Sequence, residues 1–207
     1  MEYVSRNFNP AWRIASIEVN CMILKCDPVK ASNALEEKAA VMLTSHLKYL
    51  QYRQRNLDHE QMKDRSFFHD HSDHIDRRWI QQDVLRERIG GVYYYQLLLT
   101  PCHDEPVSDY RQWTRILMHD LEGWLKLELN WYAIVHHNTN RPHIHLVLQG
   151  TGKDRETGCA RPVTFHAQDI AYLRERGRAH SEYELQQLLT EIVRELDQCD
   201  MISNETS

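Results

Sequence analysis

The chain has 207 residues, a formal net charge of −5 and five cysteines. This length is sufficient for one compact domain with its own hydrophobic core, and the sequence holds no apolar run long enough to cross a membrane. The odd number of cysteines, with no close Cys-x-x-Cys pair, argues against a disulfide framework and against a cysteine-rich zinc site.

The first half of the chain predicts one strand followed by helices. Residues 12–25 are rich in apolar and β-branched types and predict a strand, which Asp27-Pro28 should end. Apolar positions at helical spacing predict a helix over 31–55 and a shorter one over 77–89. Between them, residues 56–76 are polar and lose all periodicity, which predicts a flexible loop or flap.

The second half predicts a strand, a helix and then a β-hairpin. The segment GVYYYQLLLTP predicts a strand over 91–101, and 107–129 has the clearest amphipathic helical pattern. NWYAIVHH and HIHLVLQG predict two strands joined by the turn-forming segment NTNRP. The remaining elements that we expect are a loop over 150–161, a short strand over 162–165, and helices over 166–176 and 181–198. This order predicts an α+β fold in which helices pack on an antiparallel or mixed sheet.

Three histidines of the predicted hairpin are candidate metal ligands. His143 and His145 are two apart on one strand, so their side chains project from the same face, and His136 on the other arm is close enough to join them. Imidazole is a common ligand of divalent metals, and three ligands leave coordination positions open for a substrate. We therefore expect a catalytic metal site at His136, His143 and His145.

Tyr49, within His46-Leu47-Lys48-Tyr49-Leu50-Gln51-Tyr52-Arg53, is the second candidate. A tyrosine near a metal-bound phosphate can act as a nucleophile, provided that a cation or a base helps it to ionise. The spacing is equally consistent with Tyr49 belonging to the apolar face of its helix, and Tyr52 lies one turn away. The protein is acidic overall, but Lys48, Arg53 and Arg55 form a local basic cluster that could contact the phosphates of a nucleic acid.

Two segments resemble the HUH endonucleases, and in particular conjugative relaxases of the type that nicks T-DNA borders and plasmid transfer origins. WYAIVHHNTNRPHIHLVLQG is similar to the three-histidine motif of that superfamily, and LTSHLKYLQYR is similar to the motif with the nucleophilic tyrosine. LLLTP resembles a short motif between them, with Thr100 where serine is usual. The resemblance covers about residues 12–185.

The resemblance implies a fold with a central antiparallel sheet, the His-x-His strand in its middle and helices packed on it. It also implies a reaction in which Tyr49, or alternatively Tyr52, attacks single-stranded DNA at a transfer origin and forms a 5′-phosphotyrosyl intermediate. Mg²⁺ or Mn²⁺ would be held by the three histidines. Arg141 joins the basic cluster as a DNA contact, and His46, Thr100 and Asn138 are expected next to the ligands. Many relatives carry an acidic residue at the position of Asn138.

Other functions with the same chemistry are a rolling-circle replication initiator and a single-strand transposase. The relaxase is favoured because Tyr49 precedes the histidine motif, whereas the tyrosine usually follows it in those relatives. A non-catalytic DNA-binding module that keeps the fold is a third reading. We expect a single nicking domain over 1–200 with a short tail over 201–207. The expected location is cytoplasmic, with no membrane contact, and accessory DNA-binding or coupling proteins are candidate partners.

Overall fold

A computed structural model describes residues 23–30, 36–52, 66–101, 107–137 and 142–205. Its main sheet has six strands in the order β1-β4-β7-β6-β2-β3, and every paired neighbour is antiparallel. These strands are β1 (Ile23–Lys30), β2 (Phe67–His69), β3 (Ser72–Ile75), β4 (Val92–Thr100), β6 (Trp131–His136) and β7 (His143–Gln149). The strand with the His-x-His pattern, β7, is thus central, as expected.

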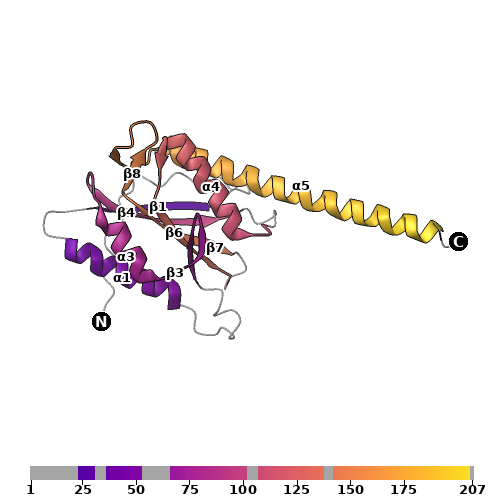
Figure 1. The fold of residues 1–207 in the computed structure, drawn as a ribbon, viewed down its shortest axis with the longest axis horizontal. Coiled ribbons are helices and arrows are strands. Elements are labelled where there is room, and N and C mark those ends of the chain that lie inside the picture. Colours follow the sequence, from indigo (N-terminus) through magenta and orange to yellow (C-terminus); the bar gives the residue numbers. More distant parts are fainter. Residues whose placement is uncertain (1–22, 31–35, 53–65, 102–106, 138–141, 206–207) are drawn as a thin grey trace.

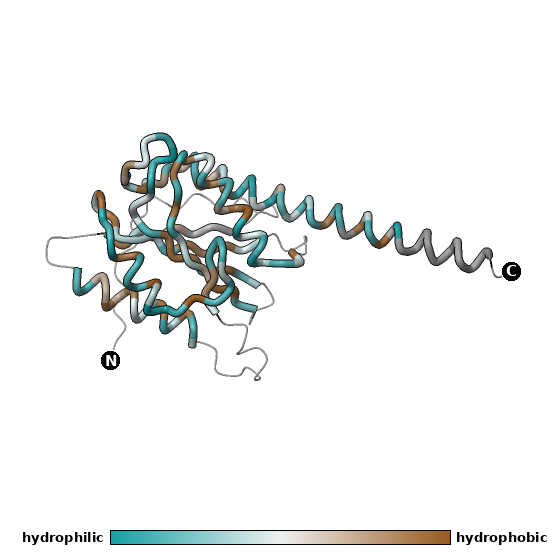
Figure 2. Tube along the Cα trace, in the orientation of Figure 1, coloured by the Kyte–Doolittle hydropathy of each residue, from teal (hydrophilic) through white to brown (hydrophobic). Residues whose placement is uncertain are grey.

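Helices cover both faces of this sheet (Figure 1). Leucines of α1 (Glu36–Tyr52) and apolar residues of α3 (Arg77–Arg86) pack on the face that carries Tyr132, Ile134 and Val147. The opposite face, with Ala133 and Leu146, packs against α4 (Tyr110–Leu125) and the start of α5 (Ala167–Glu205). Because both faces are covered, β6 is buried along its whole length. The strands of the main sheet are largely hydrophobic in Figure 2. The α+β fold is confirmed.

Strand β1 extends through Asp27-Pro28, so the prediction that this dipeptide ends the strand is wrong. Proline lacks a backbone N–H and is tolerated at a sheet edge, where one side of the strand needs no hydrogen-bonded neighbour. β1 occupies such an edge in the main sheet. Residues 12–22, where the predicted strand begins, lie outside the described residues.

The flexible loop predicted over 56–76 is also wrong for residues 66–76, because β2 and β3 form a hairpin that extends the main sheet. Phe67 and Phe68 are both fully buried, one on each face of the sheet. Arg115 of α4 holds the polar part of the hairpin, donating to the His69 carbonyl at 3.1 Å and pairing with Asp73. These contacts join residues distant in sequence, so local composition did not reveal them.

A second, three-stranded sheet replaces half of the loop expected over 150–161. It contains β5 (Leu127–Glu128), β8 (Thr151–Asp154) and β9 (Ala160–Pro162). The short strand expected over 162–165 is therefore wrong beyond Pro162, because the observed strand begins at Ala160 and ends at Pro162. The β8–β9 turn is closed by Asp154, whose carboxylate accepts from the Glu156 and Thr157 backbone N–H groups.

Helix α5 is continuous, so the break predicted between 176 and 181 is wrong. Gly177 lies inside this helix and is buried against α4, and its carbonyl accepts a hydrogen bond from the Trp113 indole at 3.3 Å. This packing offsets the roughly 1 kcal/mol by which glycine disfavours a helix relative to alanine. The outer part of α5 extends away from the domain (Figure 1). Among the described helices, none has both the length and the apolar character needed to span a membrane.

Candidate functional site

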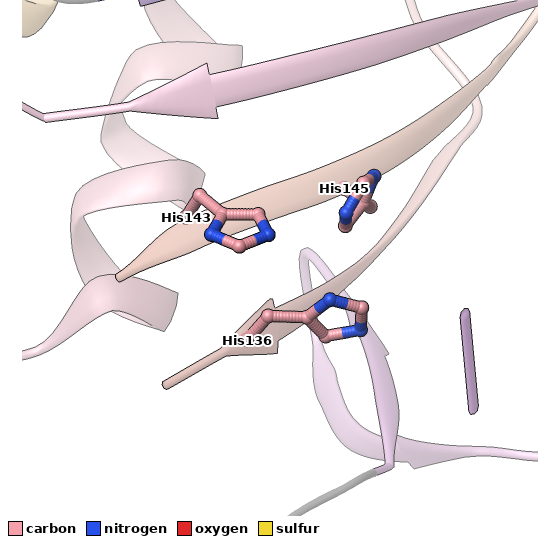
Figure 3. Close-up of side chains that lie close together, drawn as sticks. All are labelled: His136, His143 and His145. Atoms are coloured by element: carbon pink, nitrogen blue, oxygen red, sulfur yellow. The ribbon is translucent and has the colours of Figure 1, made fainter. Parts of the chain in front are cut away.

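The three predicted histidines meet on the sheet face that α1 covers. His136 and His143 are directly opposed across β6 and β7, and His145 lies two residues further along β7. The ring centroids are 5.4 Å apart for His136–His143, 4.7 Å for His136–His145 and 5.1 Å for His143–His145. Figure 3 shows the rings pointing into one space from the two strands. One ring nitrogen from each residue lies within 4.8 Å of the others.

His136 connects this cluster to α1. Its side chain is only 4% exposed, and its Nε2 lies 2.9 Å from the Leu50 carbonyl oxygen. A carbonyl only accepts, so Nε2 carries the proton and the lone pair of the neutral ring is on Nδ1. Donation of one ring N–H to a backbone carbonyl is the usual way in which a metal-binding histidine is oriented. The bond also brings the last turn of α1, the helix that carries Tyr49, against the cluster.

The cluster fits a divalent metal by its donor chemistry. Three imidazole nitrogens on two paired strands form a preorganised set, and two of the histidines, His143 and His145, are only half buried. Imidazole suits transition-metal ions, whereas Mg²⁺ prefers oxygen ligands and retains several waters. The donor set therefore fits a transition-metal ion better than it fits Mg²⁺.

The two candidate tyrosines lie on the last turns of α1. Tyr49 is 46% exposed and Tyr52 is 64% exposed, so neither is simply a core residue of the helix. The Arg77 guanidinium lies over the Tyr52 ring, 5.3 Å from its centroid, and also donates to Gln51 at 3.1 Å. Lys48 is exposed on the same helix.

The remaining predicted site residues divide into two groups. Thr100 is buried at the end of β4, and continuing the β4–β7 register by one residue places it opposite His143. His46 is half buried on α1, and burial lowers its pKa, which favours the neutral ring near pH 7. The other four predicted residues lie outside the described part of the chain: Arg53, Arg55, Asn138 and Arg141.

A cavity that Tyr132 of β6 helps to line was not predicted. It measures about 410 Å³ and lies between α3, the β2–β3 hairpin and β6, with Trp79, Asp83, His69, His74 and Tyr132 in its lining. The sequence held one signal for it. The buried residues of α3 are Ile80 and Val84, so Trp79 falls outside the buried stripe of that helix.

Comparison with known proteins identifies the family. A family model described as "Relaxase: MobA/VirD2-like, nuclease domain" matches residues 49–161, which is more than half of the chain. No curated protein matches the chain. One solved structure, from work described as "Molecular Basis of Vancomycin Resistance Transfer in Staphylococcus aureus", is similar with a TM-score of 0.47 and 13% sequence identity, over 80% of this chain and 93% of that chain. On the extent of the family-model match, the chain belongs to the MobA/VirD2-like family of relaxase nuclease domains.

Proposed function

We propose that this protein is a relaxase that nicks and rejoins one DNA strand at the transfer origin of a plasmid or mobile element. The observation that carries the proposal is the hydrogen bond between His136 and the Leu50 carbonyl. It joins a three-histidine cluster to the residue that follows Tyr49. This contact supports the proposal because it brings the turn of α1 that carries the half-exposed Tyr49 against the histidine cluster.

In the proposed reaction, the Tyr49 Oη attacks the scissile phosphorus and gives up its proton. A Tyr49 Oη–P bond forms, the P–O3′ bond breaks, and the departing 3′ oxygen takes up a proton to become a free hydroxyl. The DNA 5′ end stays attached as a phosphotyrosine. Attack by a 3′ hydroxyl reverses these steps and rejoins a strand. No external energy source is needed, because one phosphodiester replaces another.

His136, His143 and His145 would hold a divalent cation, Mn²⁺ or Mg²⁺, which supplies charge neutralisation at the scissile phosphate. Lys48 lies on the same helix as Tyr49 and would contact backbone phosphates, and Arg53, Arg55 and Arg141 are proposed as further contacts. His46, Thr100 and Asn138 are proposed to orient the groups of the site. We place the reaction in the cytoplasm, with accessory or coupling proteins as further partners.

Covalent capture tests the proposal. The protein is incubated with Mn²⁺ and single-stranded oligonucleotides that tile the element's candidate transfer origin, and the products are separated on a denaturing gel. We expect an adduct of protein and DNA that persists on the gel and is lost in Tyr49→Phe. Tyr52→Phe is the matched control, one helical turn away and equally conservative, and should retain the adduct. Persistence of the adduct in Tyr49→Phe, with loss in Tyr52→Phe, would reassign the nucleophile. Absence of cleavage for every origin strand would reject the enzyme.

A further inference from the structure

We propose that the cavity beside α3 binds an unstacked nucleobase of the single-stranded DNA substrate, and that it selects a base with an exocyclic amino group. The cavity, of about 410 Å³, is bounded by α3, the β2–β3 hairpin and β6. This inference rests on the proposed function, because it assigns part of the same substrate to a second place on the protein.

Trp79 is the first observation. Its side chain is 70% exposed although it lines the cavity, while the adjacent Ile80 is fully buried in the core. Exposure of so large an apolar ring costs solvation free energy without contributing to the fold. Aromatic side chains on which bases stack are the common device of proteins that bind single-stranded nucleic acids.

Asp83 supplies a fixed hydrogen-bond acceptor within the cavity. Its Oδ2 accepts from the Tyr132 hydroxyl at 2.7 Å and from the Asn130 amide, and its Oδ1 lies 3.6 Å from Arg86. Burial, and then the hydrogen bond to Asp83, raise the pKa of Tyr132, so this phenol keeps its proton and continues to donate. A carboxylate held in this way is suited to accept from a base amino group such as N4 of cytosine.

His69 supplies a donor in the lining of the cavity. Its Nδ1 accepts from the His71 backbone N–H at 3.2 Å, so Nε2 carries the proton. Burial lowers the pKa of His69, which favours this neutral form. Its ring meets that of Tyr132 edge-on, at a centroid distance of 5.8 Å. A donor and an acceptor together complement an amino group next to a ring nitrogen, the pattern of cytosine and adenine.

The surroundings favour a nucleotide over an uncharged ligand and connect the cavity to the histidines. Arg78 and Arg86 are exposed on α3, where they could contact phosphates while the base enters the cavity. Arg77 bridges from α3 to Gln51 and Tyr52 at the end of α1. Along β6, Tyr132 precedes His136 by four residues, a distance of about 13 Å. The selected base would thus lie a few nucleotides from the scissile phosphate.

The test compares oligomers of deoxycytidine and deoxyuridine, of about 20 nucleotides each, which differ at the exocyclic group and the adjacent ring nitrogen. Fluorescence anisotropy with the full chain in a metal-free buffer should show tighter binding of the cytidine oligomer. Trp79→Ala should weaken its binding about 5- to 150-fold, the equivalent of removing one stacked base. Trp79→Phe should keep most of the affinity. Tyr183→Ala, at a 61% exposed position on α5, is the matched control and should bind as the wild type does.

Selectivity is tested separately from stacking. Asp83→Asn should bring cytidine binding to the level of uridine binding. Because Asp83 also accepts a hydrogen bond from Tyr132, Asp83→Asn could disturb the cavity, and a second measurement therefore uses protein with the native Asp83. The cytidine oligomer should quench tryptophan fluorescence more than the uridine oligomer does. Trp79→Phe should abolish this difference in quenching. Equal binding of the two oligomers, or wild-type affinity in Trp79→Ala, would overturn the proposal.

These measurements need neither metal nor cleavage. If the cavity discriminates the two oligomers but no covalent adduct forms at any origin strand, the nicking reaction fails and the base pocket stands. If the adduct forms and Trp79→Ala binds normally, the pocket fails and the nicking reaction stands.

Discussion

His136 differs from His143 and His145 in its burial and in its bond to α1. It is almost completely enclosed and donates to the Leu50 carbonyl, whereas the other two rings are half buried on β7. Removing His136 would also remove the hydrogen bond that ties β6 to α1, so it would affect the fold as well as the site. His143 is therefore the better residue with which to test metal binding.

His143→Ala should lower the affinity for Mn²⁺ at least about 100-fold, because loss of a direct ligand costs more than the 10- to 100-fold typical of the groups that orient ligands. Isothermal titration calorimetry measures the affinity, and circular dichroism should show an unchanged fold. His137→Ala is the matched control, since the His137 ring instead meets Tyr110 of α4 at 5.5 Å. Wild-type Mn²⁺ affinity in His143→Ala would contradict the three-histidine site.

The β2–β3 hairpin is held in part by ion pairs from α4. Arg115 of α4 donates to the His69 carbonyl and pairs with Asp73. Through His69, this residue also fixes one wall of the cavity beside α3. The hydrogen bond from Arg115 lowers the pKa of Asp73. The ion pair therefore stabilises the hairpin above the ordinary aspartate pKa of about 4 and is lost as the pH falls through the depressed value.

Arg115→Ala should speed amide hydrogen exchange in residues 66–75 about fivefold, since partly exposed ion pairs contribute up to about 1 kcal/mol. Exchange in the central strand β7 should not change. Arg155→Ala provides a comparison, because Arg155 pairs with Glu122 far from the hairpin. Unchanged exchange in residues 66–75 of Arg115→Ala would show that burial of Phe67 and Phe68 is sufficient to hold the hairpin.

Elements with local signals could be predicted from the sequence, whereas elements held by distant contacts could not. The β6–β7 hairpin has apolar strands on both sides of a turn-forming segment, and its histidines were correctly placed on one face. The β2–β3 hairpin has a polar sequence, and its position depends on Phe68 pairing with Ala133 and on Arg115. The hydrogen bond between His136 and the Leu50 carbonyl could not be predicted either. Every residue has a backbone carbonyl, so the sequence does not indicate which one a side chain will contact.

The whole molecule carries a net charge of −5, which limits how much of its DNA affinity can come from phosphate contacts. The exposed cations Lys48, Arg78 and Arg86 lie on α1 and α3, the helices on the histidine side of the sheet. Binding should thus depend on a few local phosphate contacts together with base stacking. Because only a few phosphate contacts contribute, the affinity for DNA should depend modestly on salt concentration.

Lys48→Ala should reduce the slope of log affinity against log salt concentration by about 0.7, the value for one phosphate contact on a single strand. Anisotropy titrations at several salt concentrations measure this slope. Lys153→Ala is the control, because Lys153 pairs with Glu128 in the small sheet. An unchanged slope in Lys48→Ala would remove that residue from the DNA interface.

The central claim is that Tyr49 forms the covalent bond to DNA, and its most direct test is to locate the phosphate on the protein. After the cleavage reaction with Mn²⁺, nuclease digestion of the DNA and trypsin release the peptide Tyr49–Arg53, which contains both candidate tyrosines. Tandem mass spectrometry assigns the modified residue within it. We predict a phosphate-bearing remnant on Tyr49. A remnant on Tyr52, or an unmodified peptide from protein that has cleaved its DNA, would contradict the account.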